Sequence, residues 1–380
     1  MRGDAPGGRR DDPVTLALCG DVMLGRGVDC VLPHPGDPTL REPYVPDARA
    51  YVEMAEAANG PIPHPVDFSW PWGDALQALD GAAADARVVN LETSVTRSGA
   101  FAPDKSVHYR MNPANLSCLA AARPDACALA NNHVLDFGRQ GLEETLGALA
   151  GAGLRVAGAG RDGTEAWLPA VITVDGGRRV LVFSFGMESS GIPWGWAATE
   201  DRPGVAFVPE LSDAGAAEVA DRVRRVKRPG DVAVASIHWG SNWGFRVSRD
   251  QIRFAHALID CGVDLVHGHS SHHPRPLEVY RDKLILYGCG DFIDDYEGIP
   301  GYEKYRDDLR LLYFVSVEPD TGVLAGVRMA PLQPRQMRLR HASRKDTEWL
   351  RATLDRISRR FGSRIGLEPD GSLTLMPWRT

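Results

Sequence analysis

The chain has 380 residues, of which 43% are hydrophobic and 24% charged, and 43 Lys and Arg against 50 Asp and Glu give a formal charge of −7. This ordinary globular composition excludes disordered and fibrous proteins. The chain has no dense basic tract, so it lacks the electrostatic footprint of a nucleic-acid-binding protein.

Short aliphatic or β-branched runs alternate with alanine-rich segments of helical period, which is the pattern of strands joined by crossover helices. The early strands are hydrophobic throughout and predict a sheet covered on both faces. In chain order we predict strand 14–19, helices 48–58 and 74–79, strand 87–91, helix 113–122, strand 126–130, helix 140–152, strands 170–175 and 179–185, helix 212–226, strand 232–238, helix 249–261, strands 264–267, 276–280, 283–288 and 311–317, and helix 346–361.

Strands that follow each other closely late in the chain predict antiparallel hairpins and therefore a mixed sheet. Residues 276–280 and 283–288, for example, flank the two-residue turn Arg281-Asp282. Large α/β folds often use a chain of this length as one body. We expect a catalytic domain at residues 14–331 and a C-terminal extension, residues 332–380, that packs on it.

Two stretches rich in Gly and Pro, residues 32–63 and 186–203, interrupt the alternation. They are long for connections in a compact domain, so we expect lids or binding loops there. Six tryptophans lie in or near loops, and their placement favours an aromatic-lined pocket. They are Trp70, Trp72, Trp194, Trp196, Trp239 and Trp243.

The first apolar run, residues 14–19, is shorter than the core of a signal sequence or a membrane-spanning helix. No later segment reaches the spanning length without charge. The six cysteines form no C-x-x-C pair, and the chain is long enough to bury a core without disulfides. We therefore expect reduced thiols in a cytoplasmic protein with no membrane partner.

Five polar clusters directly follow predicted strands, where an α/β sheet presents its strand ends to a ligand crevice. They offer carboxylate, amide and imidazole groups without thiolates, a mixture that suits divalent metal ions. A turn or helix cap would explain any one cluster alone. Four histidines within the seven residues 267–273, however, are an unusual way to build a turn, so the clusters together predict a metal site.

Six motifs follow one another in a fixed order along the chain. They are Gly20-Asp21-Val22-Met23-Leu24-Gly25-Arg26, Asn90-Leu91-Glu92-Thr93, Asn131-Asn132-His133 with Asp136 and Gly138, His238-Trp239-Gly240, Gly268-His269 with His272 and Pro276-Leu277-Glu278, and Tyr287-Gly288-Cys289-Gly290-Asp291-Phe292. Over about residues 14–295 this series resembles that of the CapA/PgsA-type capsule and poly-γ-glutamate biosynthesis proteins, a family related to the calcineurin-like metallophosphoesterases. The resemblance implies a four-layer α/β/β/α sandwich with mixed sheets and a metal centre at the strand ends.

Two departures from the family pattern affect the expected chemistry. Asp291 stands where the family usually has Asn, which adds a carboxylate as a candidate acid or base. The phosphoesterase Asp-x-His opening is missing, since Val22 and Met23 follow Asp21, and this disfavours a tight two-metal centre. We expect one or more ions of Ca, Mn, Mg or Zn, bound directly or through water by Asp21, Glu92, Asn132, His238, His269 and His272.

A soluble branch of the family resembles the lasso-peptide epimerases, which invert Cα of the C-terminal Trp of a ribosomal precursor peptide. Such a reaction needs a cation that stabilises the enolate, and a base and an acid on opposite faces of the carbon. A histidine paired with a carboxylate suits each face. The expected catalytic residues are His133, Asp136, His269, His272 and Asp291. The expected substrate-binding residues are Arg26, Lys105 and Arg110 for a terminal carboxylate, and Trp194 and Trp239 for the peptide.

The predicted site is compatible with three functions. The peptide epimerase is favoured because the Asp-x-His opening is missing and tryptophans are abundant in loops. The alternative is a soluble CapA-like metallohydrolase that acts on phosphoester or γ-glutamyl bonds and uses the same cation to activate water. The third is a non-catalytic scaffold for an acidic polymer. A net charge of −7 argues against a surface that binds polyglutamate.

Overall fold

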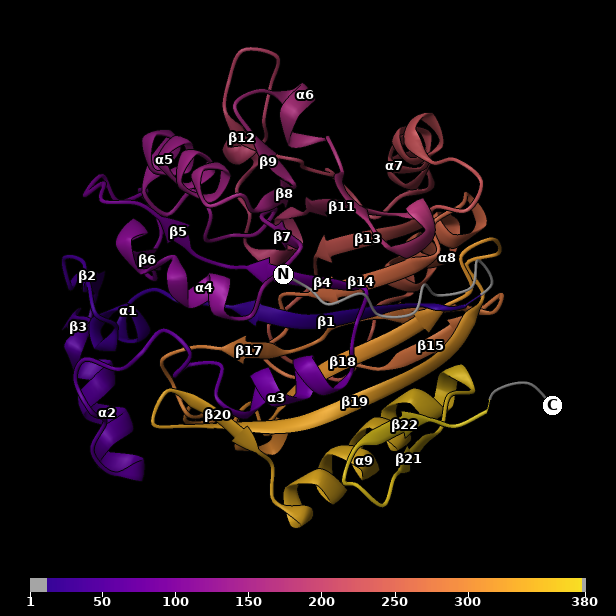
Figure 1. Ribbon diagram of the computed structural model, residues 1–380. Helices are drawn as coiled ribbons and strands as arrows, with labels where there is room; N and C mark the ends of the chain where they lie inside the picture. The colour runs from indigo at the N-terminus through magenta and orange to yellow at the C-terminus, as the bar shows by residue number, and fades with distance from the viewer. Residues whose placement is uncertain (1–11, 378–380) are drawn as a thin grey trace.

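Two β-sheets packed face to face form the centre of the molecule in the computed structural model, which describes residues 12–377 (Figure 1). The first sheet has ten strands in the order β21-β22-β19-β18-β1-β4-β7-β8, with β17 beside β1 and β20 beside β19. Its strands are β1 (Val14–Val22), β4 (Ala86–Leu91), β7 (Ala126–Ala128), β8 (Arg155–Ala157), β17 (Asp291–Ile293), β18 (Arg310–Val317), β19 (Leu324–Arg335), β20 (Arg338–His341), β21 (Ile365–Leu367) and β22 (Leu373–Leu375).

The second sheet has six strands in the order β10-β11-β13-β14-β16-β15. Its four central strands are parallel, and β10 and β15 pair antiparallel at its edges. The first sheet also combines parallel and antiparallel pairs, so the expected mixed sheets are confirmed. The six strands are β10 (Ala170–Thr173), β11 (Arg179–Gly186), β13 (Val232–His238), β14 (Leu265–His269), β15 (Leu277–Tyr280) and β16 (Lys283–Leu286).

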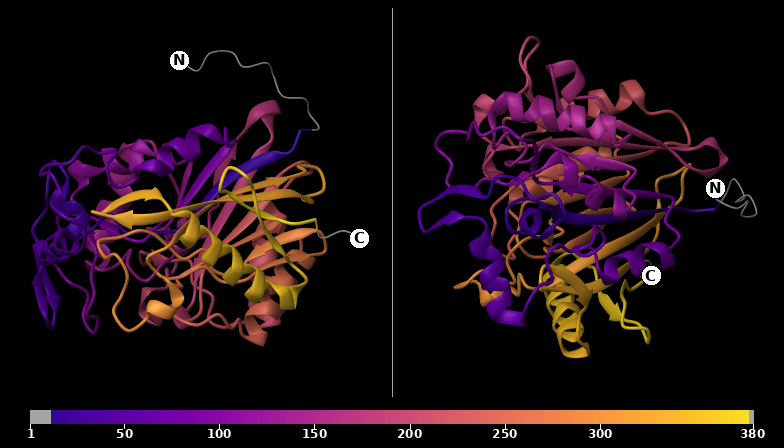
Figure 2. Two further views of the ribbon diagram at one scale, coloured as in Figure 1. Left: turned by 90° about the horizontal axis from the view of Figure 1, so that it is seen from below. Right: turned by 60° about the vertical axis from the view of Figure 1, so that its left-hand side comes forward.

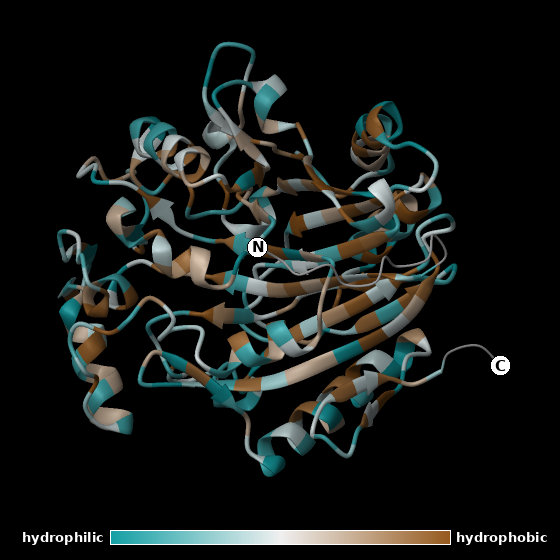
Figure 3. Cartoon of the chain, viewed as in Figure 1, coloured by the Kyte–Doolittle hydropathy of each residue, from teal (hydrophilic) through white to brown (hydrophobic). Residues whose placement is uncertain are grey.

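Helices cover the outer faces of both sheets, which gives the four-layer α/β/β/α sandwich (Figures 1 and 2). Figure 3 shows the hydrophobic residues concentrated in the strands between them. The helices are α1 (Gly27–Val31), α2 (Arg49–Asn59), α3 (Asp74–Gly81), α4 (Ser117–Ala121), α5 (Gly138–Gly151), α6 (Gly163–Ala166), α7 (Asp213–Val226), α8 (Arg249–Asp260) and α9 (Arg344–Ser358). Smaller strand pairs are β2 (Thr39–Glu42) with β3 (Val45–Asp47), β5 (Ser94–Val95) with β6 (Arg110–Met111), and β9 (Ala159–Gly160) with β12 (Gly204–Val205).

The side chains of each strand point alternately to the two faces of its sheet, which produces separate hydrophobic cores between the layers. In β1, Leu16 and Leu18 pack between the two sheets, while Ala17 and Cys19 face the helices that cover the first sheet. The strands of the second sheet divide in the same way, with α7 and α8 over their outer face. The uninterrupted apolar strands of the sequence are therefore buried on both sides, as expected.

The predicted hairpin forms as expected. β15 and β16 are antiparallel, and Arg281 and Asp282 between them have φ of 48° and 60°. Two positive φ values in succession match a type I′ turn, whose twist suits the flanking strands.

Several strands near the C-terminus were not predicted. The longest of them, β19, carries Arg and Pro at intervals, which hides its alternation. It also runs across residue 331, where we placed the domain boundary, and α9 contributes to the core between the sheets. Residues 378–380 of the expected extension lie outside the described residues. The predicted helix 113–122 is shorter than expected and begins as a 3-10 turn at Pro113–Asn115.

All six cysteines are free, as expected for reduced thiols. Among residues 12–377, no helix combines the length and the apolar character that crossing a membrane requires.

Candidate metal centre

The register of the two sheets brings polar side chains together at one end of the sandwich. In the first sheet Asp21 lies opposite Asn90 on one side and Asp291 on the other. In the second sheet His238 lies opposite His269. β1 and β13 end at the same edge of the molecule (Figure 1), so groups from both sheets converge there. Ligand sites of α/β sheets occupy this position, at the carboxyl ends of the strands.

Asp21, His238 and His269 could hold a metal ion. One ligand atom from each lies within 4.8 Å of the others, and all three residues are buried. The Nδ1 atoms of His238 and His269 are 2.8 Å apart. Two imidazole nitrogens at this separation need either a proton between them or a shared cation. One carboxylate oxygen with two imidazole nitrogens suits Zn²⁺, Mn²⁺ or Fe²⁺, so the donor set fits the expected divalent ion.

A buried hydrogen-bond chain leaves His269 with a free lone pair at Nδ1. The Cys19 carbonyl can only accept, so His267 Nε2, 2.8 Å away, donates to it. His267 Nδ1 then accepts from the Ser236 hydroxyl at 3.1 Å, and Ser236 accepts from His269 Nε2 at 3.0 Å. Outer partners of this kind fix the tautomer of metal-binding histidines. This chain therefore points His269 Nδ1 toward His238.

The carboxyl groups of the centre are held in a dry environment. Asn90 Nδ2 donates to Asp21 Oδ1 at 2.7 Å, and the Ser270 amide donates to Asp21 Oδ2 at 3.1 Å. Burial and the nearby Asp291 raise the pKa of Asp21 to about 7. Burial and Asp21 likewise raise the pKa of Glu92. A bound cation would compensate these buried negative charges, which is a second reason that the site fits a divalent ion.

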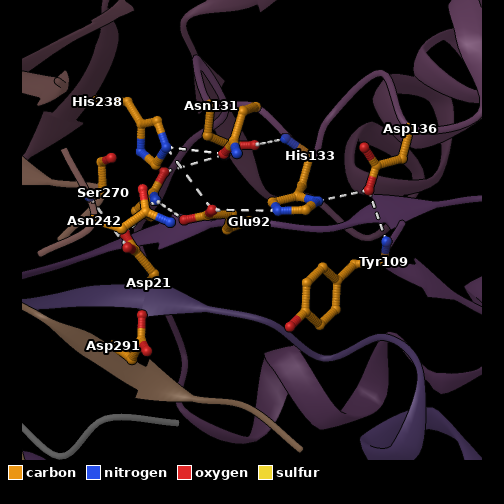
Figure 4. Close-up of polar contacts among 12 residues, drawn as sticks. Asp21, Glu92, Tyr109, Asn131, His133, Asp136, His238, Asn242, Ser270 and Asp291 are labelled. Carbon is orange, nitrogen blue, oxygen red and sulfur yellow. Dashed lines mark hydrogen bonds and ion pairs between the residues drawn. The ribbon is translucent and has the colours of Figure 1, made fainter. Parts of the chain in front are cut away.

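His133 forms one histidine–carboxylate unit beside the centre (Figure 4). Its Nδ1 lies 2.7 Å from Asp136 Oδ2, which also accepts from the Tyr109 amide at 2.6 Å. Burial lowers the pKa of His133 to about 4, so the ring is neutral at pH 7 and Nδ1 donates to Asp136. His133 Nε2 then carries a lone pair and lies 3.8 Å from Glu92 Oε1. This arrangement suits a general base.

His272 forms a second such unit with Asp291. Its Nδ1 lies 3.0 Å from both carboxylate oxygens of Asp291, and Tyr296 donates to the same carboxylate at 2.6 Å. Burial opposes a charge on His272, but Asp291 outweighs burial and raises the pKa of the ring. The raised pKa means that His272 keeps a proton more strongly than a free imidazole, which suits a general acid, and Asn242 Nδ2 lies 2.9 Å from its Nε2. Tyr109 and Tyr296 were not singled out from the sequence, where nothing marks them.

A cavity of about 610 Å³ opens onto both units. Its polar end is lined by Glu92, Asn132, His133, His238 and His272. Asn132 Oδ1 lies 3.0 Å from His238 Nε2. The aromatic residues of the cavity are Tyr51, Tyr109 and Tyr296, not the tryptophans expected. A larger cavity of about 900 Å³, at His341 and Leu367, contains none of the predicted site residues.

The predicted carboxylate-binding arginines are occupied by other partners. Arg26 binds Asp295 through Nε and Nη2, at 3.0 and 2.5 Å, and Glu42 at 2.8 Å. The rings of Tyr51 and Tyr109 lie 4.0 and 4.1 Å from its guanidinium.

Arg110 lies outside the cavity and donates to the carbonyls of Ser98 and Asp37, at 2.9 and 2.6 Å. Lys105 reaches the cavity but forms an ion pair with Asp136, and burial lowers its pKa.

Other predicted residues are structural or peripheral. Trp239 is 1% exposed and donates to the Tyr287 carbonyl at 3.1 Å, so it belongs to the core. Trp194 is 54% exposed and donates to Glu188 at 3.1 Å, and neither tryptophan lines the cavity. Of the four clustered histidines, His267 supports His269, and His273 stacks on Tyr305 with ring centroids 4.6 Å apart.

The fold is a four-layer α/β/β/α sandwich with oxygen and nitrogen groups that could hold a metal ion at its strand ends. The family described as "Bacterial capsule synthesis protein PGA_cap" matches residues 15–296. The chain therefore belongs to this capsule synthesis family, and the resemblance to CapA-type proteins is confirmed.

Relatives agree with this assignment. The "Probable polyglutamine synthesis accessory protein" of Mycobacterium tuberculosis is 56% identical over 367 residues, 96% of this chain and 97% of the relative. The "PGA biosynthesis protein CapA" of Bacillus subtilis is 26% identical over 309 residues, 80% of this chain and 68% of the relative. A solved 5′-nucleotidase precursor from Thermus thermophilus is similar with a TM-score of 0.47 and 14% identity, over 84% of this chain and 54% of that chain. These names lend no support to the lasso-peptide branch.

Proposed function

We propose that the chain is a metal-dependent hydrolase of a phosphoester or γ-glutamyl bond. The observation that carries this proposal is the buried cluster of Asp21, His238 and His269 beside the polar end of a 610 Å³ cavity. When bound there, a divalent ion would supply Lewis acidity, which polarises the bond and acidifies water. The γ-glutamyl alternative draws on the capsule and PGA synthesis names of the relatives.

The two histidine–carboxylate units supply the proton transfers in this proposal. Neutral His133 takes a proton from the attacking water at Nε2, and Asp136 stabilises the imidazolium that forms. Protonated His272 gives its proton to the leaving group, and Asp291 holds the ring in place. Lys105, which contacts both His133 and Asp136, positions the base.

The test uses two chromogenic probes, p-nitrophenyl phosphate and γ-glutamyl-p-nitroanilide, with the protein loaded with Mn²⁺ or Zn²⁺. We expect release of nitrophenol or nitroaniline that EDTA abolishes and added metal restores. His133→Ala should lower turnover by about 10²-fold or more, the usual scale for loss of a general base. The matched control, His341→Ala, removes an exposed histidine and should leave turnover unchanged. Cleavage of neither probe by any metal-loaded form would contradict the proposal.

Cα epimerisation of a peptide is the second candidate, and the presence of two separate histidine–carboxylate units favours it. Figure 4 shows Asp136 and Asp291, the carboxylates of the two units, at opposite ends of the group of polar residues. Incubation of a peptide in D₂O distinguishes the two reactions. An epimerase places one deuterium at Cα and keeps the chain length, whereas a hydrolase shortens or dephosphorylates its substrate without exchange at Cα.

A further inference from the structure

The 610 Å³ cavity continues from the histidines into an apolar half. One wall comes from α2 and the other from the segment that follows β17. We call the apolar part of the cavity lining the apolar half, and it consists of Met23, Met54, Ala55, Ala58, Val107, Ile299 and Pro300. Met54 is 51% exposed although it is large and apolar, while Met23 is 2% exposed. An exposed methionine at the rim of a cavity offers adaptable apolar surface to a ligand.

Both walls are held in place by polar contacts of Glu297 and Arg26, two residues that also line the cavity. The Glu297 carboxylate accepts from the Asn59 side chain at the end of α2 and from the Gln336 amide. Arg26 ties α2 to the other wall through Tyr51 and Asp295. The apolar half is therefore formed before any substrate binds, which lowers the entropy cost of binding.

Among the described residues that line the cavity, no cation is free to bind an anionic chain. The lining contains Arg26, Lys105 and His272 against Glu92, Asp295 and Glu297, and His272 is paired with Asp291. Arg26 is neutralised by Asp295 and Glu42, and Lys105 by Asp136. A poly-γ-glutamate chain places a carboxylate on every residue, and in this half such a carboxylate would lose water without gaining a partner.

We propose that the apolar half is a specificity subsite for an apolar group directly beside the bond that reacts, so the substrate is an ester or amide with an aliphatic or aromatic substituent. This inference rests on the proposed function and narrows its substrate class. The polar end binds the reacting group, and the subsite accepts the substituent and rejects a polyanion.

The test compares two ligands that share a phosphonate group and differ in the length of their alkyl group. Methylphosphonate and hexylphosphonate are titrated calorimetrically into Mn²⁺-loaded protein, because phosphonates bind without reacting. Each buried methylene should tighten binding about fourfold. We therefore expect hexylphosphonate to bind at least tenfold more tightly than methylphosphonate. Met54→Glu should remove this difference, whereas the matched control Met376→Glu, at a methionine 43% exposed and outside the cavity, should retain it.

Methionine methyl NMR provides an independent measurement that requires no turnover. Hexylphosphonate should shift the methyl signals of Met23 and Met54 and leave that of Met376 unchanged. Equal affinity for the two phosphonates would overturn the subsite, as would tighter binding of a γ-glutamyl pentapeptide than of hexylphosphonate. If neither phosphonate binds, the proposed function fails separately, and 1-hexanol then decides the subsite. A shift of the Met54 methyl signal by hexanol supports it, and no shift overturns it.

Discussion

Removal of the metal is expected to make folding stability depend on pH through Asp21. Burial and the neighbouring Asp291 raise the pKa of this carboxyl group from 3.8 to about 7 when no cation is bound. Between these values the folded protein holds a proton that the unfolded chain releases. The contribution of Asp21 to the free energy of unfolding is therefore largest at low pH and falls as pH rises through this window.

The size of the effect follows from the shift. One pKa unit corresponds to about 1.4 kcal/mol, so the Asp21 contribution should fall by about 2 to 3 kcal/mol between pH 5 and pH 7. Buried histidines change the free energy of unfolding with pH in the opposite direction. Burial lowers the pKa of His133 to about 4, so its stabilisation is lost as pH falls from about 6.5. The contribution of Asp21 to the pH dependence of stability is therefore measured by comparing wild type with a variant at this position.

The assay is urea unfolding of EDTA-treated wild type and Asp21→Asn at pH 5 and pH 7. Relative to wild type, the variant should gain about 2 to 3 kcal/mol of stability between the two pH values. Asp213→Asn, at an aspartate whose side chain is 82% exposed at the start of α7, should gain nothing. Saturating Mn²⁺ should stabilise wild type at pH 7 by mass action. Parallel pH profiles of wild type and Asp21→Asn without metal would refute the reasoning.

Three further predictions concern single side chains. Asp21→Ala should lose bound metal in elemental analysis, and full occupancy would remove Asp21 from the set of ligands. Arg310→Met should lower the free energy of unfolding, measured by urea unfolding, by about 3 to 5 kcal/mol. The reason is that Arg310 and Asp294 form an ion pair with both side chains 0% exposed, and the variant leaves Asp294 without its partner. A loss below about 1 kcal/mol would contradict this prediction. Trp239→Ala should lower the free energy of unfolding by about 3 to 5 kcal/mol, whereas Trp194→Ala should change the stability measured by thermal unfolding little. Equal losses of stability for the two variants would refute the assignment of Trp239 to the core and Trp194 to the surface.

Residues at strand ends were the part of the site that the sequence could predict. Asp21 is the last residue but one of β1, and His238 and His269 end β13 and β14, so their chemical type and position predict a metal site, which stays a prediction. The apolar pattern likewise predicted all six strands of the second sheet, the hairpin at residues 281–282 and a sheet covered on both faces, while the four-layer sandwich was implied by the family resemblance. These features are local, because a strand and its final residue are encoded by neighbouring positions.

Only the tertiary structure decided which groups remain free for a ligand, because this depends on contacts between segments that lie far apart in the sequence. Arg26 looked like a carboxylate-binding residue, but Asp295, which lies 269 positions away, occupies it. Trp239 follows a strand as a pocket residue would, yet its ring is buried against Tyr287. The apolar half of the cavity joins α2 to residues 299–300. Burial and ion pairing between such segments leave no periodic signal in either one, so the sequence determined which groups could bind a metal ion and the tertiary structure determined the space around them.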